Sequence, residues 1–148
     1  MANTPNAYMT PQAAVLGHCN LAAVTACTTR GPTATAGLAA ANIVVAVPTV
    51  ATDCKITKIS LKAISTSISA PTAAQLVGVW DWDGTTAYLV KEIVVSLVTP
   101  STTSPSFESD TLYDDFTLPA GHALYLSTTV TTTAATTALG ATIHGATL

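Results

Sequence analysis

The sequence predicts an all-β protein, a jelly-roll-like β-sandwich of about eight short antiparallel strands. Alanine and threonine together make up more than a third of the 148 residues, and Thr, Val and Ile favour extended backbone because they branch at Cβ. Eight Pro and eight Gly are scattered along the chain, where they would interrupt long helices. Short apolar runs between closely spaced turn signals are typical of a sandwich or barrel.

Two regions are expected along the chain. Residues 1–12 contain Pro5 and Pro11 with few apolar anchors, so they predict an extended N-terminal arm that becomes ordered against a neighbouring subunit. They lack the basic start and apolar centre of a secretory signal. Residues 13–148 are long enough to bury a core and are predicted to form one β-sandwich domain.

The first part of the domain predicts short strands separated by turn residues. Gly31-Pro32 marks a turn, and Pro48 stops the strand before it because proline cannot donate to a sheet. The predicted strands are Ala13–Leu16, Leu21–Cys27 and Ala39–Val47.

The clearest strand is predicted at Lys55–Ile64. In its second half, apolar and polar residues alternate with the period of a half-buried strand. The apolar residues before Thr57-Lys58, which include Cys54 and Ile56, fall in the opposite phase. A β-bulge near Thr57-Lys58 is therefore expected, because one extra residue restores the register.

A hairpin is predicted in the middle of the chain, because Asp83-Gly84 is a strong turn signal between two β-rich runs. The run before it, Gln75–Trp82, is apolar in both phases and predicts a central strand covered on both faces. The return strand is predicted at Tyr88–Val98. Its residues Leu89, Ile93, Val95 and Leu97 are expected on one face, interrupted by Lys91.

The C-terminal third predicts further strands around a tight turn. Leu118-Pro119-Ala120-Gly121 fits a turn with proline in the second position and glycine in the fourth. Asp114-Asp115 is expected in an exposed loop. The strands are predicted at Phe107–Leu112, Phe116–Leu118, Ala123–Val130 and Ala141–Gly145.

The sequence carries no recognised pattern of catalytic or metal-binding residues. Its histidines, His18, His122 and His144, show no metal-ligand spacing, and there is no nucleophile elbow, phosphate-binding loop or dinucleotide fingerprint. Only 9% of the residues are charged, which leaves few groups for acid–base chemistry. The chain is therefore predicted not to be an enzyme, and to have no catalytic residue, cofactor or metal site.

Charge and hydropathy also argue against nucleic-acid and membrane partners. The net charge of −3 is too small to suggest binding to phosphates. The stretch Gly31–Thr52 is uncharged, but Asn42, Pro48 and many Thr and Ala dilute it, so a buried strand is expected there and not a membrane span. The three cysteines lack CxxC spacing and are expected to be free, buried thiols: Cys19, Cys27 and Cys54.

The stretch Trp80-Asp81-Trp82-Asp83-Gly84 contains candidate contact residues. Trp80 and Trp82 share a strand phase, which indicates core or interface anchors, and a sugar could also stack on them. Asp81 and Asp83 are spaced like the start of a calcium loop, but the distal Glu of such a loop is absent. Capping of the turn by Asp83 is the simpler interpretation.

Further candidates lie in an acidic stretch and in the arm. Asp110, Asp114 and Asp115 form a small acidic patch, which fits either an exposed loop or a docking surface for a basic partner or for a cation between subunits. The residues predicted to contact a partner are Tyr8, Pro11, Trp80, Trp82, Asp114 and Asp115.

The low charge has consequences for the surface. A soluble monomer normally covers itself with more charged residues than this chain provides. A surface rich in Thr, Ser and Ala suits a protein that is largely covered by partners, and it also suits a secreted or heat-resistant domain. We favour assembly.

Several stretches share a pattern of strands and turns: Cys54–Ala63, Gln75–Val79 with Asp83-Gly84, Leu89–Val95 and Leu118–Gly121. Together they resemble the small virion proteins of tailed bacteriophages that are described as head decoration, or cement, proteins. The resemblance covers roughly residues 50–128, and the opening Thr4-Pro5 and Tyr8–Pro11 also look like that family's arm. The chain departs from the family at Ile143–Leu148, where a Gly-Gly and an acidic or aromatic finish would be expected.

The resemblance implies a β-sandwich that binds the major capsid protein on the outer face of a phage head and clamps neighbouring capsomers, often as a homotrimer. The protein would then be part of the virion, assembled in the host cytoplasm. The alternative is a receptor- or glycan-binding module of a phage tail or fibre, with Trp80, Trp82 and Tyr88 as its binding face. A hydrolase, the third hypothesis, would need a pocket with a perturbed His or Asp.

Overall fold

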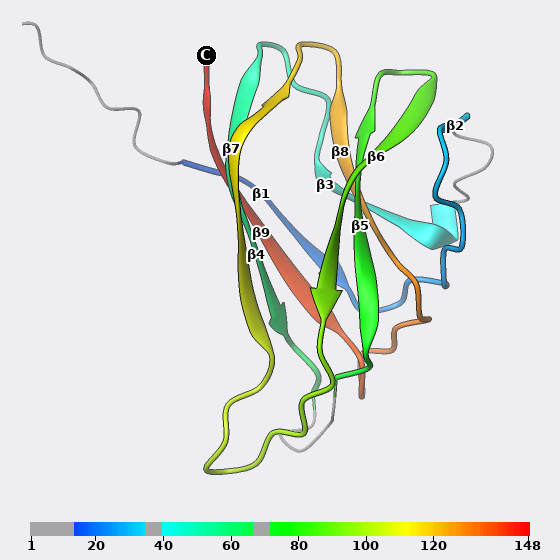
Figure 1. Ribbon diagram of the computed structural model, residues 1–148, viewed down its shortest axis with the longest axis vertical. Helices are drawn as coiled ribbons and strands as arrows, with labels where there is room; N and C mark the ends of the chain where they lie inside the picture. The colour runs from blue at the N-terminus through cyan, green and yellow to red at the C-terminus, as the bar shows by residue number, and fades with distance from the viewer. Residues whose placement is uncertain (1–13, 35–39, 67–71) are drawn as a thin grey trace, which may run out of the picture.

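A computed structural model of the chain describes residues 14–34, 40–66 and 72–148 (Figure 1). In these ranges the regular structure consists of β-strands and one 3-10 turn, η2 (Ala40–Asn42). The prediction of an all-β protein is confirmed. The predicted arm at residues 1–12, with Tyr8 and Pro11, lies outside the described residues.

Two antiparallel sheets pack face to face (Figure 1). The four-stranded sheet has the order β1 (Ala14–Leu21), β9 (Leu139–Thr147), β4 (Cys54–Ala63) and β7 (Glu108–Leu118). The five-stranded sheet has the order β2 (Thr33–Ala34), β6 (Thr86–Val95), β5 (Gln75–Trp82), β8 (Ala123–Thr128) and β3 (Ile43–Val47).

The connectivity is that of a jelly roll. Apart from the two-residue β2, the strands pair as β1 with β9, β3 with β8, β4 with β7 and β5 with β6. The chain is thus one long antiparallel hairpin, closed at the β5–β6 turn and rolled up so that successive pairs alternate between the sheets. The jelly-roll prediction is confirmed.

The main core lies between the two sheets. Ile59 of β4 and Leu126 of β8 are fully buried there, and burying an aliphatic side chain of this size contributes about 1.5–3 kcal/mol. A second, smaller cluster contains Cys27, Trp80 and Ala87. Because Trp80 alternates with core residues along β5, this second cluster lies on the outer face of the five-stranded sheet.

The sandwich is closed along one side. A Cβ atom at Gly17 of β1 would collide with the carbonyl oxygen of Ala46 in β3, so glycine allows the two strands to approach each other. The opposite side is bounded by β6 and β7, which face the viewer in Figure 1. This difference between the two sides determines which strand edges remain accessible.

Several strand predictions are confirmed in detail. β4 has the expected bulge, with the register shift falling between Ile56 and Lys58. β5 begins and ends at the predicted residues. The hairpin turn after it uses Gly84 at φ 99°, a left-handed conformation that favours glycine.

The predicted common face of Leu89 and Ile93 is wrong. The β5–β6 register shifts between Val79 and Trp80, because β6 has an extra residue at Val90. Leu89 therefore packs in the outer cluster, whereas Ile93 and Val95 enter the main core. The return strand also ends at Val95 and not at Val98.

Other corrections concern strand boundaries. Only Leu21 of the predicted Leu21–Cys27 strand belongs to a strand, and β3 is preceded by η2. The two strands predicted around Asp114-Asp115 are one strand, β7, so these aspartates do not form a separate loop. The first strand starts at Ala14 and continues to Leu21, β8 ends at Thr128, and the last strand extends over Leu139–Thr147.

The predicted tight turn is displaced by one residue. His122 N–H donates to the carbonyl of Pro119 at 3.0 Å, so proline is first in the turn and not second. Gly121 occupies the third position at φ 86°. This is the position at which a type II turn requires a left-handed residue, usually glycine.

Candidate functional site

Trp80 is buried in the cluster on the outer face of the five-stranded sheet. Its side chain is 1% exposed, and its Nε1–H donates to Ser127 Oγ at 2.8 Å. A Cβ at Gly78 would come within 2.9 Å of Trp80 Nε1 and 2.7 Å of Ser127 Oγ, so glycine leaves the space in which this hydrogen bond forms. The roles predicted for Trp80 are an anchor in the core or at an interface and a surface on which a sugar could stack. The structure shows it as the anchor of a buried cluster.

Trp82 is half-buried and stacks on Tyr125 of β8, with ring centroids 5.6 Å apart and planes inclined by 26°. Its Nε1 is buried and has no hydrogen-bond partner among the described residues. Tyr88 pairs with Asp81, which places it on the other face of the sheet. Trp80, Trp82 and Tyr88 therefore do not form the common binding face that the glycan hypothesis expected.

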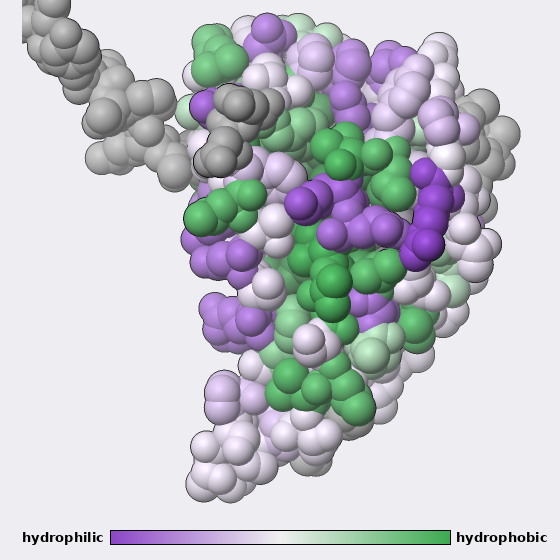
Figure 2. Space-filling model, viewed as in Figure 1, coloured by the Kyte–Doolittle hydropathy of each residue, from purple (hydrophilic) through white to green (hydrophobic). Residues whose placement is uncertain are grey.

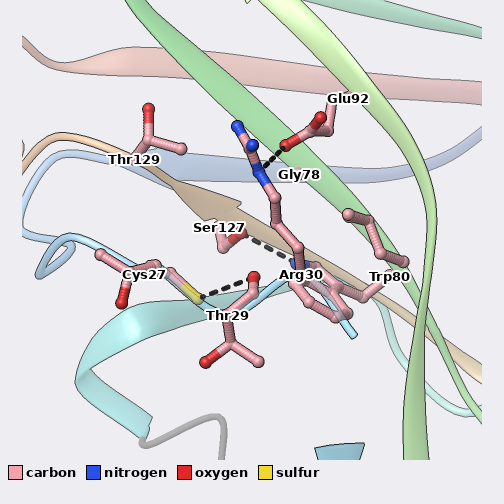
Figure 3. Close-up of a pocket in the computed structure, with 10 residues that line it drawn as sticks. Cys27, Thr29, Arg30, Gly78, Trp80, Glu92, Ser127 and Thr129 are labelled. Atoms are coloured by element: carbon pink, nitrogen blue, oxygen red, sulfur yellow. Dashed lines mark hydrogen bonds and ion pairs between the residues drawn. The ribbon is translucent and has the colours of Figure 1, made fainter. Parts of the chain in front are cut away.

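A pocket of about 270 Å³ lies over the outer face of the five-stranded sheet (Figure 3). Trp80 and Leu89 contribute apolar walls, and the segment from Cys27 to Arg30 closes one side. Arg30 Nε lies 2.9 Å from Glu92 Oε1 across the opening. The pocket thus combines an apolar floor with one exposed ion pair, an arrangement suited to binding more than to proton transfer.

Cys27 is the one sulfur in the lining of this pocket, and its Sγ is 4.0 Å from the carbonyl oxygen of Thr29. Neither His nor Asp is among the described lining residues. The thiol therefore shares the pocket with hydroxyl, backbone and apolar groups and with the Arg30–Glu92 ion pair. Sequence reasoning missed this pocket, because nothing in the local pattern shows that residues 27–30 fold over the outside of β5 and β6.

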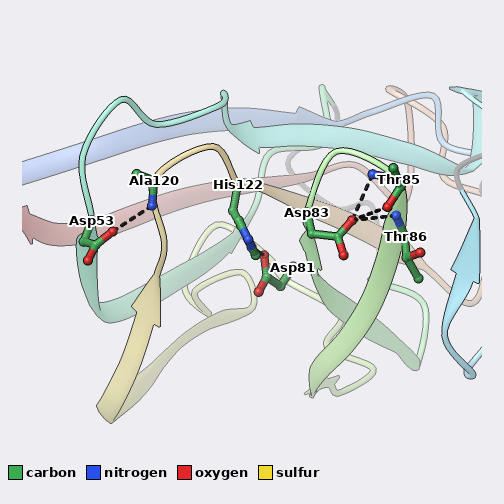
Figure 4. Close-up of polar contacts among 7 residues, drawn as sticks. All are labelled: Asp53, Asp81, Asp83, Thr85, Thr86, Ala120 and His122. Carbon is green, nitrogen blue, oxygen red and sulfur yellow. Dashed lines mark hydrogen bonds and ion pairs between the residues drawn. The ribbon is translucent and has the colours of Figure 1, made fainter.

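The β5–β6 turn is capped by Asp83 (Figure 4). Its Oδ1 accepts hydrogen bonds from Thr86 N at 2.7 Å and from Thr85 N and Oγ1 at 2.9 Å each. These bonds, led by that from the Thr86 backbone, lower the pKa of Asp83. This geometry agrees with the interpretation of Asp83 as the cap of the turn.

Asp81 points to a different partner. Its Oδ1 lies 2.8 Å from Nδ1 of His122, the residue just before β8 (Figure 4). At the same end of the sandwich, Asp53 Oδ1 accepts a hydrogen bond from Ala120 N at 2.8 Å. These contacts hold connections between strands together, and the Asp81 and Asp83 carboxylates engage separate partners, unlike ligands of one calcium ion.

The acidic stretch lies on β7. Asp110 pairs with Lys58 of β4 at 3.2 Å, and hydrogen bonds from Ser60 and Lys58 lower the pKa of Asp110. The backbone of Asp114 and Asp115 lies in the bulge between Leu112 and Phe116, while their side chains are outside what the structure describes. The predicted docking role of these two aspartates stays a prediction.

The described residues hold no group of three or more His, Cys, Asp or Glu side chains that could bind a metal ion. Within those same ranges, no helix is long and apolar enough to cross a membrane. His18 Nδ1 lies 3.0 Å from Thr142 Oγ1, on the outer face of the four-stranded sheet, and His122 pairs with Asp81. Neither contact includes a nucleophilic thiol.

Large apolar side chains are exposed over much of the surface. Leu112 of β7 is 74% exposed and Val94 of β6 is 65% exposed. The sequence shows that both positions are apolar. Sequence periodicity does not indicate whether another part of the molecule covers them. The exposed set is Val15, Val45, Ile64, Tyr88, Val90, Val94, Leu97, Leu112, Val130 and Leu148.

Comparison of the chain with family models, with curated proteins and with solved structures found no match. The fold therefore defines the class, a jelly-roll β-sandwich. Many unrelated functions share this architecture, so function has to be argued from the surfaces described above.

Proposed function

We propose that this protein is a virion structural protein, a decoration or cement protein that binds the outer surface of a tailed-phage head and stabilises the shell. The observation that carries the proposal is the surface: only 9% of all residues in the chain are charged, and large apolar side chains such as Leu112 and Val94 are exposed. Exposed apolar side chains of this kind suit contact with partner proteins. The resemblance of roughly residues 50–128 to head decoration proteins favours the phage head as the site of assembly.

The proposed mechanism is mass action. A protein that binds only the assembled shell stabilises it by a free energy that grows with the logarithm of 1 + L/Kd, where L is the concentration of the free protein. The exposed apolar side chains would supply the area buried against the shell. The proposed partner is the major capsid protein, with sister copies as further partners, at the surface of the virion.

The test is thermal release of packaged DNA. Heads stripped of this protein are heated alongside heads to which the purified full chain has been added back. We expect the stripped heads to release DNA at a lower temperature, and the reconstituted heads to recover the original value. Unchanged DNA retention after stripping would contradict the stabilising role.

The alternative function, a glycan-binding module of a tail or fibre, has one observation in its favour. Trp82 and Tyr125 form a half-buried aromatic stack on the outer sheet face, a surface on which a sugar ring can pack. A glycan array probed with the wild-type chain and with Trp82→Ala separates the two proposals. Decoration predicts no glycan signal, whereas a signal lost in Trp82→Ala would favour the alternative.

A further inference from the structure

The accessible edges of the two sheets differ in chemistry. β1 and β3 lie against each other on the closed side of the sandwich. β7 carries four of the eight acidic residues of the chain between Glu108 and Asp115. Pairing β7 with a copy of itself would bring carboxylates together, which is a common way to protect an edge.

The edge of β6 lacks this protection. Among the described residues, β2 covers it only at Thr86 and Ala87. From Tyr88 onward no described strand pairs with that side of β6, and Tyr88, Val94 and Leu97 are 45%, 65% and 65% exposed. Figure 2 shows apolar side chains, in green, above and below a band of hydrophilic side chains, in purple, on the face that contains β6 and β7.

The charged residues of this segment are few. Glu92 is held by Arg30 at 2.9 Å, on the outer face of the sheet. Lys91 is exposed and forms no salt bridge among the described residues. The uncovered edge is therefore close to neutral, in contrast to that of β7.

The direction of the backbone groups follows from the contact just beyond β6. Thr72 N donates to the carbonyl of Val98 at 2.9 Å, on the β5 side. Backbone groups point to alternate sides along a strand. Ile93, Val95 and Leu97 therefore direct their N–H and C=O groups away from β5, toward the uncovered side.

We propose that this edge of β6 docks a second copy of the chain, as an antiparallel strand pair with a two-fold axis at Val94. The ladder extends from Lys91 to Leu97. Ile93 then lies opposite Val95 of the other copy, and Val94 lies opposite its own counterpart. The two five-stranded sheets become one continuous sheet.

Charge excludes two of the possible registers. Pairs centred on Lys91 or Glu92 would place like charges directly opposite each other, which is destabilising. With the axis at Val94, Lys91 faces Leu97 and Glu92 faces Ser96. The exposed Val94 also extends an apolar row from Leu76, its partner in β5, across the two-fold axis.

The strength of the association follows from its size. One strand pair buries less than the roughly 1,200 Å² typical of stable interfaces, so the dimer should dissociate on dilution. The inference does not depend on the proposed role in a phage head, because it concerns the purified chain alone.

Sedimentation of the full chain from about 1 μM to about 1 mM, a range from tight to weak binding, tests the proposal. We expect a reversible monomer–dimer equilibrium in the wild type and a monomer throughout for Val94→Lys, because lysine on an edge blocks strand addition. Val45→Lys is the matched control: Val45 is 49% exposed on edge strand β3, and this variant should behave as wild type.

A cross-link checks the register. Val94→Cys should form a disulfide-linked dimer under mild oxidation, since directly opposed residues of a non-hydrogen-bonded pair lie close enough for a disulfide. Val45→Cys should not, and the native cysteines are buried.

A wild type that stays monomeric or forms trimers, or a dimer that persists in Val94→Lys, overturns the proposal. A monomeric chain whose Val94→Lys variant fails to bind heads would instead assign the edge to a shell strand.

Discussion

Single residues position the indole of Trp80. Gly78 lies beside it on the same face of the sheet, and its missing side chain lets Nε1 reach Ser127 Oγ. The contact connects β5 to β8 beneath the pocket. An aromatic residue that periodicity places on the outer face becomes buried because a glycine and a serine lie next to it.

Gly78→Ala is expected to destabilise the fold by about 1–3 kcal/mol, the usual effect of overpacking a well-packed site. The added Cβ would come within 2.7 Å of Ser127 Oγ and 3.2 Å of Leu89 Cδ1, so the hydrogen bond from Trp80 would be displaced. Denaturant unfolding followed by tryptophan fluorescence measures the change. Gly31→Ala is the control, since a Cβ there meets nothing within 4 Å, and equal losses in both variants would contradict this account.

At the scale of elements, the two bulges show what a sequence pattern can reveal. The bulge in β4 breaks an alternation of apolar and polar residues, so the phase change is visible in the sequence. The bulge at Val90 lies in a strand with apolar residues in both phases and one charged residue in each, Lys91 and Glu92, so a phase change leaves no clear signal. Periodicity therefore locates a bulge only where one face of the strand is polar.

The β5–β6 hairpin should depend on pH through Asp83. Hydrogen bonds from Thr86 and Thr85 favour the ionised carboxylate, so the folded pKa lies below the ordinary 3.8. For a lowered pKa, the contribution to stability is present above the unfolded value and is lost as pH falls through the folded value. The stability difference between wild type and Asp83→Ala should therefore be constant near neutral pH and shrink below about pH 3.8.

Unfolding in denaturant from pH 7 to pH 2 measures this difference. Glu108→Ala, which removes an exposed carboxylate at the start of β7, is the comparison. A difference for Asp83→Ala that persists unchanged at pH 2 would mean that the cap does not act through its charge. Asp110, whose pKa is also lowered, remains intact in both variants.

At the scale of the whole molecule, the thiols lie in the interior and the charged groups lie toward the surface. The three cysteines are buried, and burial raises the pKa of Cys19 to about 11. The few charges lie toward the surface, among exposed apolar side chains. The molecule has a well-sealed interior and an exterior suited to contact with other proteins.

Thiol reactivity should report on this sealed interior. We expect slow reaction of native protein with a thiol reagent at pH 8, and rapid reaction of three thiols per chain in denaturant, because only thiolates react and burial suppresses their formation. Cys27, which lines the outer pocket, should react first, and Cys27→Ser should remove that first phase. Rapid reaction of Cys19 in the native protein would contradict the described core.

The sequence by itself determined the strand-rich class, the β4 bulge, the bounds of β5 and the Asp83-Gly84 hairpin, because each leaves a local signal in periodicity or turn chemistry. Tertiary structure decided what local signals cannot carry. It buried Trp80 while leaving Trp82 half-buried, joined the strands around Asp114-Asp115 into β7, and brought Cys27–Arg30 over β5 and β6. Among the described residues, it also left the β6 edge from Tyr88 onward without a paired strand. The physical reason is that strand pairing and coverage depend on residues far apart in the chain, which meet only when the hairpin is rolled into two sheets.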